Sequence, residues 1–391
     1  MISPSGRPRP DQRLLALIPY GVPYGGGVTV AELVRRSGLS RPTVAEALDR
    51  LLADGAVRCG PGAGSGGVGR PARRWRRGPP QGMFAAIALS RDAVRVRVAD
   101  GDDGDDGKVA DRLHRLDVSL DAHGALSTGR DLLHECLTEL TTGAESLATV
   151  VLGLPCPVGD DEQPQARGIL PGWIGARPAE QLRDWLPGAQ IFVDNDANLG
   201  AVGELAVGAG RDCRDFVYVK MAPGLGAALV VDGRLYRGAG GLAGEIGHVQ
   251  INELGHPCIC GARGCLGAEM HIAALHGTGG NAGLAALAEL FRRYEAGDAA
   301  CGRTLSTMGG LLGEQLGAVA NMLDPERVVI STDQTPPHPK LLDGIRDGIR
   351  RTALPAISDL PVLPSPLGVH AETVGAITLA RERHAEGSGV R

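Results

Sequence analysis

Apolar residues recur with helical spacing in one segment near the start of the chain, TVAELVRRSGLSRPTVAEALDRLLADGAV. Thr29 and Ser40 each precede such a run and can cap a helix, and Gly38 between them permits a tight turn. The pattern predicts one helix over residues 30–37 and a second that begins after Ser40. On the second helix we expect these residues to face inward: Val44, Ala47, Leu48, Leu51 and Leu52. Two short helices joined by a glycine turn predict a helix-turn-helix.

The segment after these helices predicts a hairpin. AVRCG suits a strand, PGAGSGGVG is too rich in glycine to be more than a flexible tip, and RPARRWRRG returns with five arginines. A hairpin in this place is the wing of a winged helix-turn-helix.

Charge is distributed unevenly along the chain. Residues 1–78 contain 13 Arg, no Lys and 5 acidic residues, a net charge of +8, whereas the remainder carries −13. This predicts that only the first segment meets a polyanion. A winged module places the start of its second helix in the major groove, and arginines of the wing suit the minor groove and the phosphates. The residues expected to contact DNA are Ser40, Arg41, Thr43, Glu46, Arg70, Arg73, Arg74, Arg76 and Arg77. The alternative is a solvated basic linker beside a helical hairpin.

Beyond residue 82 the pattern mixes strands and helices. The segment from Met83 alternates like successive antiparallel strands, ATVVLGLP is typical of a buried strand, and AQIFVDNDANLGAVGELAVGAG predicts a strand that runs into a helix. These features predict an α/β body. The sequence contains no run of about 18 apolar residues, the length that a transmembrane helix needs. The start of the chain lacks the apolar segment of a signal peptide. We therefore expect a cytoplasmic, nucleoid-associated protein that does not meet the membrane.

One short region predicts a metal site. His248, Cys258, Cys260 and Cys265 offer one imidazole and three thiolates, a set that suits tetrahedral zinc. Gly261 and Gly264 allow the tight turns that aim the sulfurs. No fifth ligand is evident, which predicts a closed, structural zinc site. The alternative is a surface loop of reduced cysteines.

Four motifs in order resemble the ROK family (repressor, open reading frame, kinase). They are LPGW at 170–173, DNDAN at 194–198, GLAGEIGH at 241–248 and CICGARGC at 258–265. An amino-terminal winged helix-turn-helix that ends in GRPARR also resembles the regulators of this family. The resemblance implies an actin-like, ribonuclease-H-like α/β fold of two lobes, in which the final helix returns to the first lobe.

The resemblance also implies a division of the chain. We expect a disordered tail over 1–10, the winged helix-turn-helix over 11–78, a linker over 79–82, a small lobe over 83–195 with 371–391, and a large lobe over 196–370. The large lobe would hold the zinc site and the dimerisation surface.

The resemblance assigns sugar contacts to Asn195, Asp196, Glu245 and His248, and Asp196 would be the catalytic base of a kinase. The loops that hold ATP depart from the family pattern. The segment 88–92 reads ALSRD where D-[IV]-G-[GA]-T is expected, 222–226 reads APGLG, and Ser331 and Thr332 replace a glycine pair. We therefore expect no kinase activity and regard Asp196 as a relic base. Gly267 also stands where the family has a sugar-binding glutamate, and helix geometry predicts that Glu269 points elsewhere.

We predict a DNA-binding transcriptional repressor that forms a homodimer, or a tetramer, on a palindromic operator and senses a sugar-like effector. Two alternatives stay open. One is a carbohydrate kinase with an accessory DNA-binding domain. The other is a ligand-independent regulator whose pocket is a structural relic.

Overall fold

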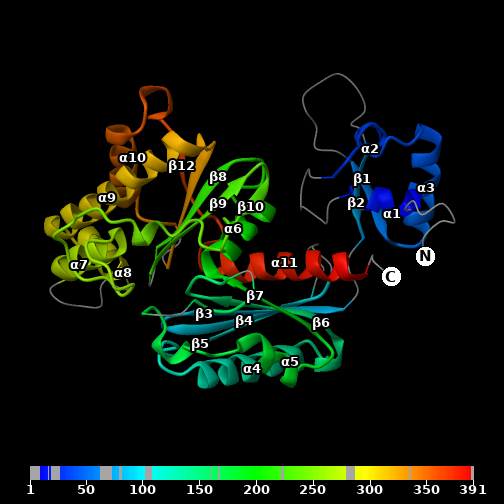
Figure 1. Cartoon of the computed structure of the whole chain (residues 1–391), viewed down its shortest axis with the longest axis horizontal. Coiled ribbons are helices and arrows are strands. Elements are labelled where there is room, and N and C mark those ends of the chain that lie inside the picture. Colours follow the sequence, from blue (N-terminus) through cyan, green and yellow to red (C-terminus); the bar gives the residue numbers. More distant parts are fainter. Residues whose placement is uncertain are drawn as a thin grey trace.

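The computed structural model describes residues 9–15, 17–18, 27–61, 73–78, 82–101, 108–159, 161–165, 168–221, 224–278, 287–333 and 336–388. Figure 1 shows a small helical unit at the amino-terminal end and a larger body built around two sheets. Across these ranges no helix is both long enough and apolar enough to cross a membrane.

The amino-terminal unit contains three helices and a two-stranded antiparallel hairpin. Its elements are α1 (Pro10–Leu15), α2 (Val30–Ser37), α3 (Arg41–Ala53), β1 (Val57–Pro61) and β2 (Arg73–Arg77). The two predicted helices begin where their caps stand, because the Thr29 hydroxyl accepts from the backbone N–H of Glu32 and that of Ser40 accepts from Thr43. Helix α1 begins at Pro10, the last residue of the range expected to be a tail. Residues 1–8, and residues 62–72 with nearly all of the tip expected at 61–69, lie outside the described residues.

This unit has its own apolar core. Leu14, Leu33, Leu48 and Trp75 are buried in it with other apolar residues of the three helices and the hairpin. The prediction for Leu52 was wrong, because its side chain is 45% exposed. Adjacent residues of a helix point about 100° apart, so when Leu51 faces the core, Leu52 points away from it.

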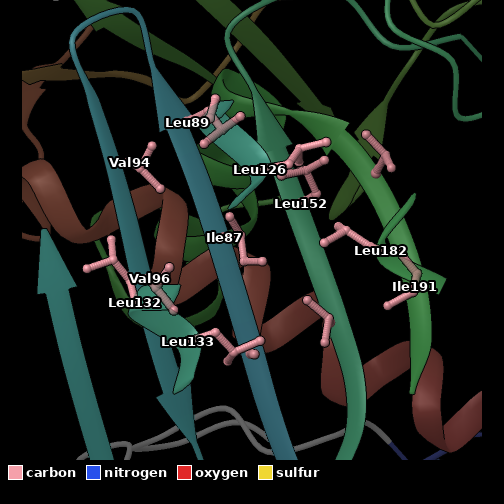
Figure 2. Close-up of a cluster of buried hydrophobic side chains, with 14 of the residues drawn as sticks. Ile87, Leu89, Val94, Val96, Leu126, Leu132, Leu133, Leu152, Leu182 and Ile191 are labelled. Carbon is pink, nitrogen blue, oxygen red and sulfur yellow. The ribbon is translucent and has the colours of Figure 1, made fainter. Parts of the chain in front are cut away.

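The first sheet of the body has the order β5-β4-β3-β6-β7. Its strands are β3 (Met83–Ser90), β4 (Ala93–Ala99), β5 (Val109–Arg115), β6 (Leu147–Leu154) and β7 (Gln190–Asn195). Three antiparallel strands are followed by two parallel ones. One face packs on α4 (Ala122–Glu139) and α5 (Pro178–Trp185), and Figure 2 shows the Leu, Ile and Val side chains between these layers.

The second sheet repeats this pattern with the order β10-β9-β8-β11-β12. Its strands are β8 (Phe216–Met221), β9 (Leu225–Val231), β10 (Arg234–Tyr236), β11 (Arg327–Thr332) and β12 (Val362–Pro364). Its outer face packs on α7 (Leu266–Thr278), α8 (Leu287–Glu295), α9 (Ala299–Leu323) and α10 (Pro339–Thr352).

Two further helices lie between the sheets. Helix α6 (Asp196–Val207) packs on the second sheet, and α11 (Ala371–Ser388) packs on the first. Figure 1 shows α11 crossing the middle of the body above the first sheet. The two helices also pack against each other, so the chain crosses between the sheets at this pair.

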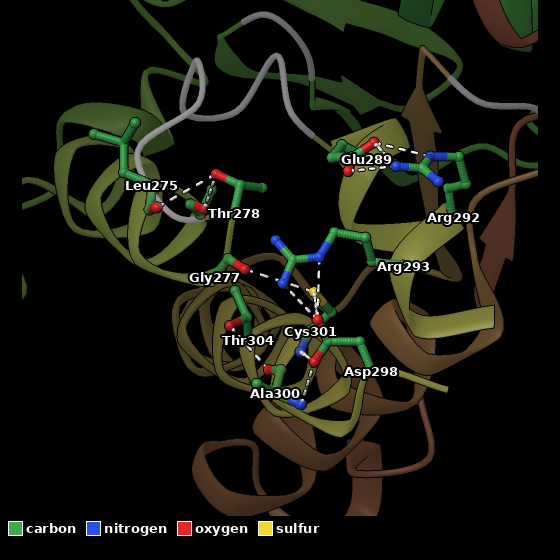
Figure 3. A network of polar contacts seen from close by, with 11 residues as sticks. Leu275, Gly277, Thr278, Glu289, Arg292, Arg293, Asp298, Ala300, Cys301 and Thr304 are labelled. Atoms are coloured by element: carbon green, nitrogen blue, oxygen red, sulfur yellow. Dashed lines mark hydrogen bonds and ion pairs between the residues drawn. The ribbon is translucent and has the colours of Figure 1, made fainter. Parts of the chain in front are cut away.

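Helix α9 begins at a charged cap next to α8, which Figure 3 shows from close by. The Asp298 carboxylate accepts from the backbone N–H of Ala300 at 2.9 Å and of Cys301 at 3.3 Å. Its other oxygen accepts from the Arg293 guanidinium, with Nη2 at 2.5 Å. The contact with Arg293, followed by the thiol of Cys301, lowers the pKa of Asp298 from 3.8 to about 2.

We expect this cap to make folding depend on pH. Because the pKa of Asp298 is lower in the folded chain, its contribution is fully present above about pH 4 and is lost as the pH falls toward 2. In the variant Asp298→Asn, the side-chain amide can still cap α9 but carries no charge. The variant should melt below the wild type at pH 5, and the difference in Tm should shrink between pH 4 and pH 2.5. A difference that stays constant over this range would contradict the assignment.

Candidate functional site: a cysteine–histidine cluster beside buried acidic side chains

The four predicted metal ligands meet in space. His248 lies in a short 3-10 helix (Ile246–His248), the cysteines lie in the loop that follows, and Cys265 directly precedes α7. One ligand atom from each of His248, Cys258, Cys260 and Cys265 falls within 4.8 Å of the others. Residues 17 positions apart in the sequence thus form one cluster, as predicted.

The distances within the cluster fit a tetrahedral ion. A Zn–S bond of about 2.3 Å and a Zn–N bond of about 2.0–2.1 Å place tetrahedral ligands roughly 3.8 Å apart for two sulfurs and roughly 3.6 Å apart for sulfur and nitrogen. The Cys260 and Cys265 sulfurs are 3.8 Å apart, and Cys258 Sγ is 3.5 Å from His248 Nδ1. Burial lowers the pKa of His248, which favours the neutral imidazole that binds metals.

The loop is held by glycine geometry and by one carboxylate. Gly261 and Gly264 both have positive φ, and a Cβ on Gly264 would collide with the Asn252 carbonyl oxygen. Glu269 on α7 accepts from the backbone N–H of His256 at 2.7 Å and contacts the His256 ring at 3.2 Å. Glu269 therefore braces the cysteine loop, which agrees with the expectation that it points away from the pocket.

Two of the residues predicted to bind a sugar, Asn195 and Asp196, lie at the junction of β7 and α6. Asn195 caps α6, since its side-chain oxygen accepts from the N–H groups of Ala197 at 2.9 Å and Asn198 at 3.1 Å. Its amide nitrogen donates to the Cys156 carbonyl at 3.1 Å. Most of the hydrogen-bonding capacity of Asn195 thus serves the fold.

Glu245 lies near Asp196, and His248 lies next to Glu245. His248 Nε2 lies 4.0 Å from a Glu245 carboxylate oxygen, while Nδ1 of the same ring faces Cys258. Burial and the neighbouring Asp196 carboxylate raise the pKa of Glu245 to about 7. The imidazole therefore lies between the cysteine cluster and the Glu245 carboxylate.

The structure places two residues beside Asp196 that the sequence analysis missed. Lys220 Nζ lies 2.6 Å from Asp196 Oδ2 and 2.5 Å from Glu372 Oε1, and all three side chains are at least four-fifths buried. Burial alone would lower the pKa of Lys220, but the two carboxylates raise it above its ordinary value. The signal for Lys220 was a lone lysine in the apolar strand FVYVKM; nothing in the sequence marked Glu372 as its partner.

A second ion pair, in which the carboxylate is buried and the guanidinium is half-buried, involves Asp194, two residues before Asp196. Arg237, in the loop after β10, donates to both oxygens of Asp194 at 2.7 and 2.5 Å, and Asp194 is 3% exposed. Asp194 also accepts from the Asn195 backbone N–H and the Asn198 side chain. This pair was missed as well, because the partners are 43 residues apart in sequence.

The segments that correspond to phosphate loops carry ordinary structural contacts. Ala88 is buried in β3, Asp92 pairs with Arg115, and the Arg91 guanidinium donates to the Ile169 carbonyl at 2.9 Å. Ser331 and Thr332 are both buried in β11, and Ser331 donates to the Gly368 carbonyl at 3.3 Å. Residues 222–223 lie outside the described residues.

Apart from Arg70, the residues predicted to contact DNA lie at the cap and first turns of α3 and in β2. Ser40, Arg41 and Glu46 are exposed, and Thr43 is half-buried. Ser40 and Thr43 share a hydroxyl contact of 2.7 Å, and Glu46 pairs with Arg50 at 2.8 Å.

On the hairpin, Arg73 is exposed and Arg74 donates to the Gly27 carbonyl at 2.7 Å. Arg76 and Arg77 belong to β2, but their side chains, like all of Arg70, lie outside the described residues.

Comparison with known proteins identifies the body. The family model described as "ROK family" matches residues 121–383. The xylose repressor of Bacillus subtilis (strain 168) is 26% identical over 251 residues, 63% of this chain and 64% of the repressor. The DNA-binding transcriptional dual regulator NagC of Escherichia coli (strain K12) is 30% identical over 202 residues, 49% of this chain and 50% of NagC. The chain thus spans about half to two thirds of the length of these curated relatives.

An enzyme and a solved structure are also similar. A glucokinase of Halalkalibacterium halodurans is 31% identical over 274 residues, 65% of this chain and 82% of the glucokinase. The crystal structure of a ROK family transcriptional regulator, a homolog of the E. coli MLC protein, has a similar fold with a TM-score of 0.70 at 21% identity, covering 98% of this chain and 97% of that one. The extent of the family match and the likeness to the glucokinase lead to one conclusion: the chain belongs to the ROK family.

Proposed function

We propose that this chain is a DNA-binding transcriptional repressor whose body is a degenerate sugar kinase that senses a sugar-like effector. The observation that carries the proposal is the helix-turn-helix of α2 and α3 with an arginine-rich hairpin, attached to a ROK body. The relatives named xylose repressor and DNA-binding transcriptional dual regulator support the same function.

We infer that the amino-terminal unit is a winged helix-turn-helix, because two short helices that meet at Gly38 are followed by an antiparallel hairpin. Its second helix starts at the exposed Ser40 and Arg41, where a recognition helix meets base edges and phosphates. Arg73 is an exposed cation on the hairpin, and Arg70, Arg76 and Arg77 add charge to the same segment of sequence. Glu46 and Arg74 already have partners within the unit, so we expect them to orient neighbouring side chains as well as to contact DNA.

The body is better suited to sensing than to phosphoryl transfer. A kinase base must accept a proton from the sugar hydroxyl, but a buried ammonium lies 2.6 Å from Asp196. The segments at 88–92 and 331–332 offer buried or paired side chains where phosphate oxygens would need backbone donors. Asn195, Asp196, Glu245 and His248 remain as polar groups that can bind the hydroxyls of a sugar.

The remaining parts of the proposal follow from this function. Zinc held by His248, Cys258, Cys260 and Cys265 would be structural and would orient the imidazole toward the pocket. Residues 11–78 would read DNA in the cytoplasm, while the body, with lobes at 83–195 plus 371–391 and at 196–370, would form a homodimer. Effector binding would change the spacing of the two DNA-binding units and hence the affinity for a palindromic operator.

Loss of Arg41 is expected to weaken DNA binding. The variant Arg41→Ala should bind operator-containing duplex about 5- to 150-fold more weakly, since one arginine contact contributes roughly 1–3 kcal/mol. If the contact is to phosphate, the slope of log Kd against log salt concentration should also fall by about one. Fluorescence anisotropy over a salt series, on a duplex selected from genomic fragments, measures both. The double variant Arg41→Ala/Arg70→Ala should bind more weakly still.

The matched control is Arg350→Ala, which removes the same charge from α10 of the body. Its DNA affinity should stay within about twofold of the wild type. Equal losses in Arg41→Ala and Arg350→Ala would mean that net charge alone drives binding and would contradict the assigned role of α3.

The two alternatives have direct tests. Kinase activity is tested because one relative is a glucokinase. We expect a coupled ATPase assay with glucose, xylose and N-acetylglucosamine to show no turnover. A thermal-shift screen with the same sugars, amino sugars and sugar phosphates is expected to find a stabilising compound. No stabilisation by any compound would favour a regulator with a relic pocket.

A further inference from the structure

Lys220 connects the two helices that lie between the sheets. Asp196 is the first residue of α6, and Glu372 is the second residue of α11. The Lys220 ammonium on β8 contacts both carboxylates, at 2.6 and 2.5 Å, and all three side chains are at least four-fifths buried. In such surroundings charge pairing is much stronger than at a surface, so one ammonium shared by two carboxylates is sensitive to a change at either one.

Helices α6 and α11 are packed so closely that each can move only as a rigid unit, either together with the other helix or by sliding along it. An added Cβ on Gly375 of α11 would collide with the Leu199 carbonyl of α6, and one on Gly203 of α6 would collide with the Ala371 carbonyl of α11. Backbone therefore meets backbone with no side chain between. A displacement at the first turn of α11 cannot be absorbed by side-chain rearrangement at this interface.

The other end of α11 contacts the strand that follows the DNA-binding unit. The His384 ring packs edge-on against Phe84 at 5.6 Å between ring centres, and Arg381 donates to the Asp100 carbonyl at 2.6 Å. Phe84 is the second residue of β3 and lies six positions after Gly78, which directly follows the last strand of the hairpin. Helix α11 thus reaches from the ion pairs of Lys220 to β3, the first strand of the body.

We propose that Lys220 couples occupancy of the pocket to the position of α11 and, through α11, to the DNA-binding unit. The inference rests on the proposed function, because it assigns the regulation of that same pocket. A ligand hydroxyl that hydrogen-bonds to Asp196 competes with Lys220 for that carboxylate. The ammonium then moves toward Glu372, the first turn of α11 is held more tightly to β8, and the shift reaches Phe84 through His384.

Two variants of the full-length protein test the coupling without any ligand. In Glu372→Gln the ammonium keeps Asp196 and loses its charged partner on α11. In Asp196→Asn the ammonium has only Glu372, which imitates an occupied pocket. Hydrogen–deuterium exchange should therefore change in opposite directions in the two variants, faster in Glu372→Gln and slower in Asp196→Asn, at the amides of residues 376–386 and 84–86. We expect about fivefold or more each way, the lower end of typical allosteric couplings.

A control separates this coupling from general damage to the core. Arg237→Gln breaks the neighbouring pair with Asp194, which joins the loop after β10 to β7 and leaves the contacts of Lys220 in place. Exchange at residues 376–386 should then stay within about twofold of the wild type. Acceleration in both Asp196→Asn and Glu372→Gln, or an Arg237→Gln variant that matches Glu372→Gln, would overturn the proposal.

Affinity for duplex DNA provides an independent readout. Relative to the wild type, Glu372→Gln and Asp196→Asn should shift the Kd in opposite directions by about fivefold or more. If the wild type bound no duplex, the proposed function would fail, while the exchange measurement would still decide the coupling. Opposite exchange shifts together with an unchanged Kd in both variants would overturn the link from α11 to the DNA-binding unit.

Discussion

The variant Cys265→Ser is expected to lose its metal and to be strongly destabilised. Cys265 is fully buried, and its sulfur is one of four ligand atoms within 4.8 Å. Serine is a poor zinc ligand, so the proposed site would lose a thiolate and, with it, the zinc ion that would tie the loop to His248. A zinc concentration about 1,000 times the Kd stabilises a folded protein by about 4 kcal/mol, and we expect a loss of this order in the free energy of unfolding.

Metal analysis by plasma mass spectrometry and denaturant unfolding test this expectation together. The wild type should contain about one zinc per chain, and Cys265→Ser should contain almost none. Cys213→Ser is the matched control, because Cys213 is buried but lies outside the cluster. It should keep its zinc. Full zinc content in Cys265→Ser, or an unchanged free energy of unfolding after metal loss, would contradict a structural metal site.

Replacement of Gly313 by alanine is expected to destabilise the second half of the body. Gly313 lies on α9 where the helix crosses α10, and an added Cβ would collide with the Ile345 carbonyl oxygen and the Gly348 Cα. Because both obstacles belong to the backbone, the helices must separate to make room. Overpacking costs roughly 1–3 kcal/mol and sometimes more. We expect about 3 kcal/mol, which corresponds to a fall in Tm of about 6–12 °C.

The same helix offers a control of identical chemistry. Gly310 is one turn earlier on α9, and an added Cβ there meets only the flexible end of Arg351 at 3.0 Å. Alanine is favoured over glycine in a helix interior by up to about 1 kcal/mol. Gly310→Ala should therefore be neutral or stabilising. Equal effects of the two variants in differential scanning calorimetry would show that backbone contact between α9 and α10 does not limit this packing.

Local features of the sequence were enough to predict the amino-terminal unit. Thr29, Ser40 and Gly38 act on backbone groups within four residues, so the ends of α2 and α3 can be read without knowledge of the rest of the fold. Leu52 shows the limit of the same approach. Periodicity cannot say how wide a buried stripe is, because the width depends on what the helix packs against.

The cysteine cluster could also be predicted, because three of its ligands lie within eight residues and glycines allow the turns between them. The orientation of the His248 ring could not be predicted from the sequence. Only the folded chain places Nδ1 toward Cys258 and Nε2 toward Glu245. The predicted sugar contact of Asn195 also needs revision, because much of the hydrogen-bonding capacity of its side chain is used to cap α6.

By itself, the sequence determined the helix ends, the hairpin, the four ligands of the cluster and the departure of the phosphate segments from the family pattern. These properties depend on residues near one another in the chain and on side-chain chemistry. Only the tertiary structure decided that Lys220 joins Asp196 to Glu372, that Arg237 pairs with Asp194 and that α9 meets α10 through glycines. These partners are 24 or more residues apart, and a charge can be buried only where the folded chain brings its counter-charge within contact distance.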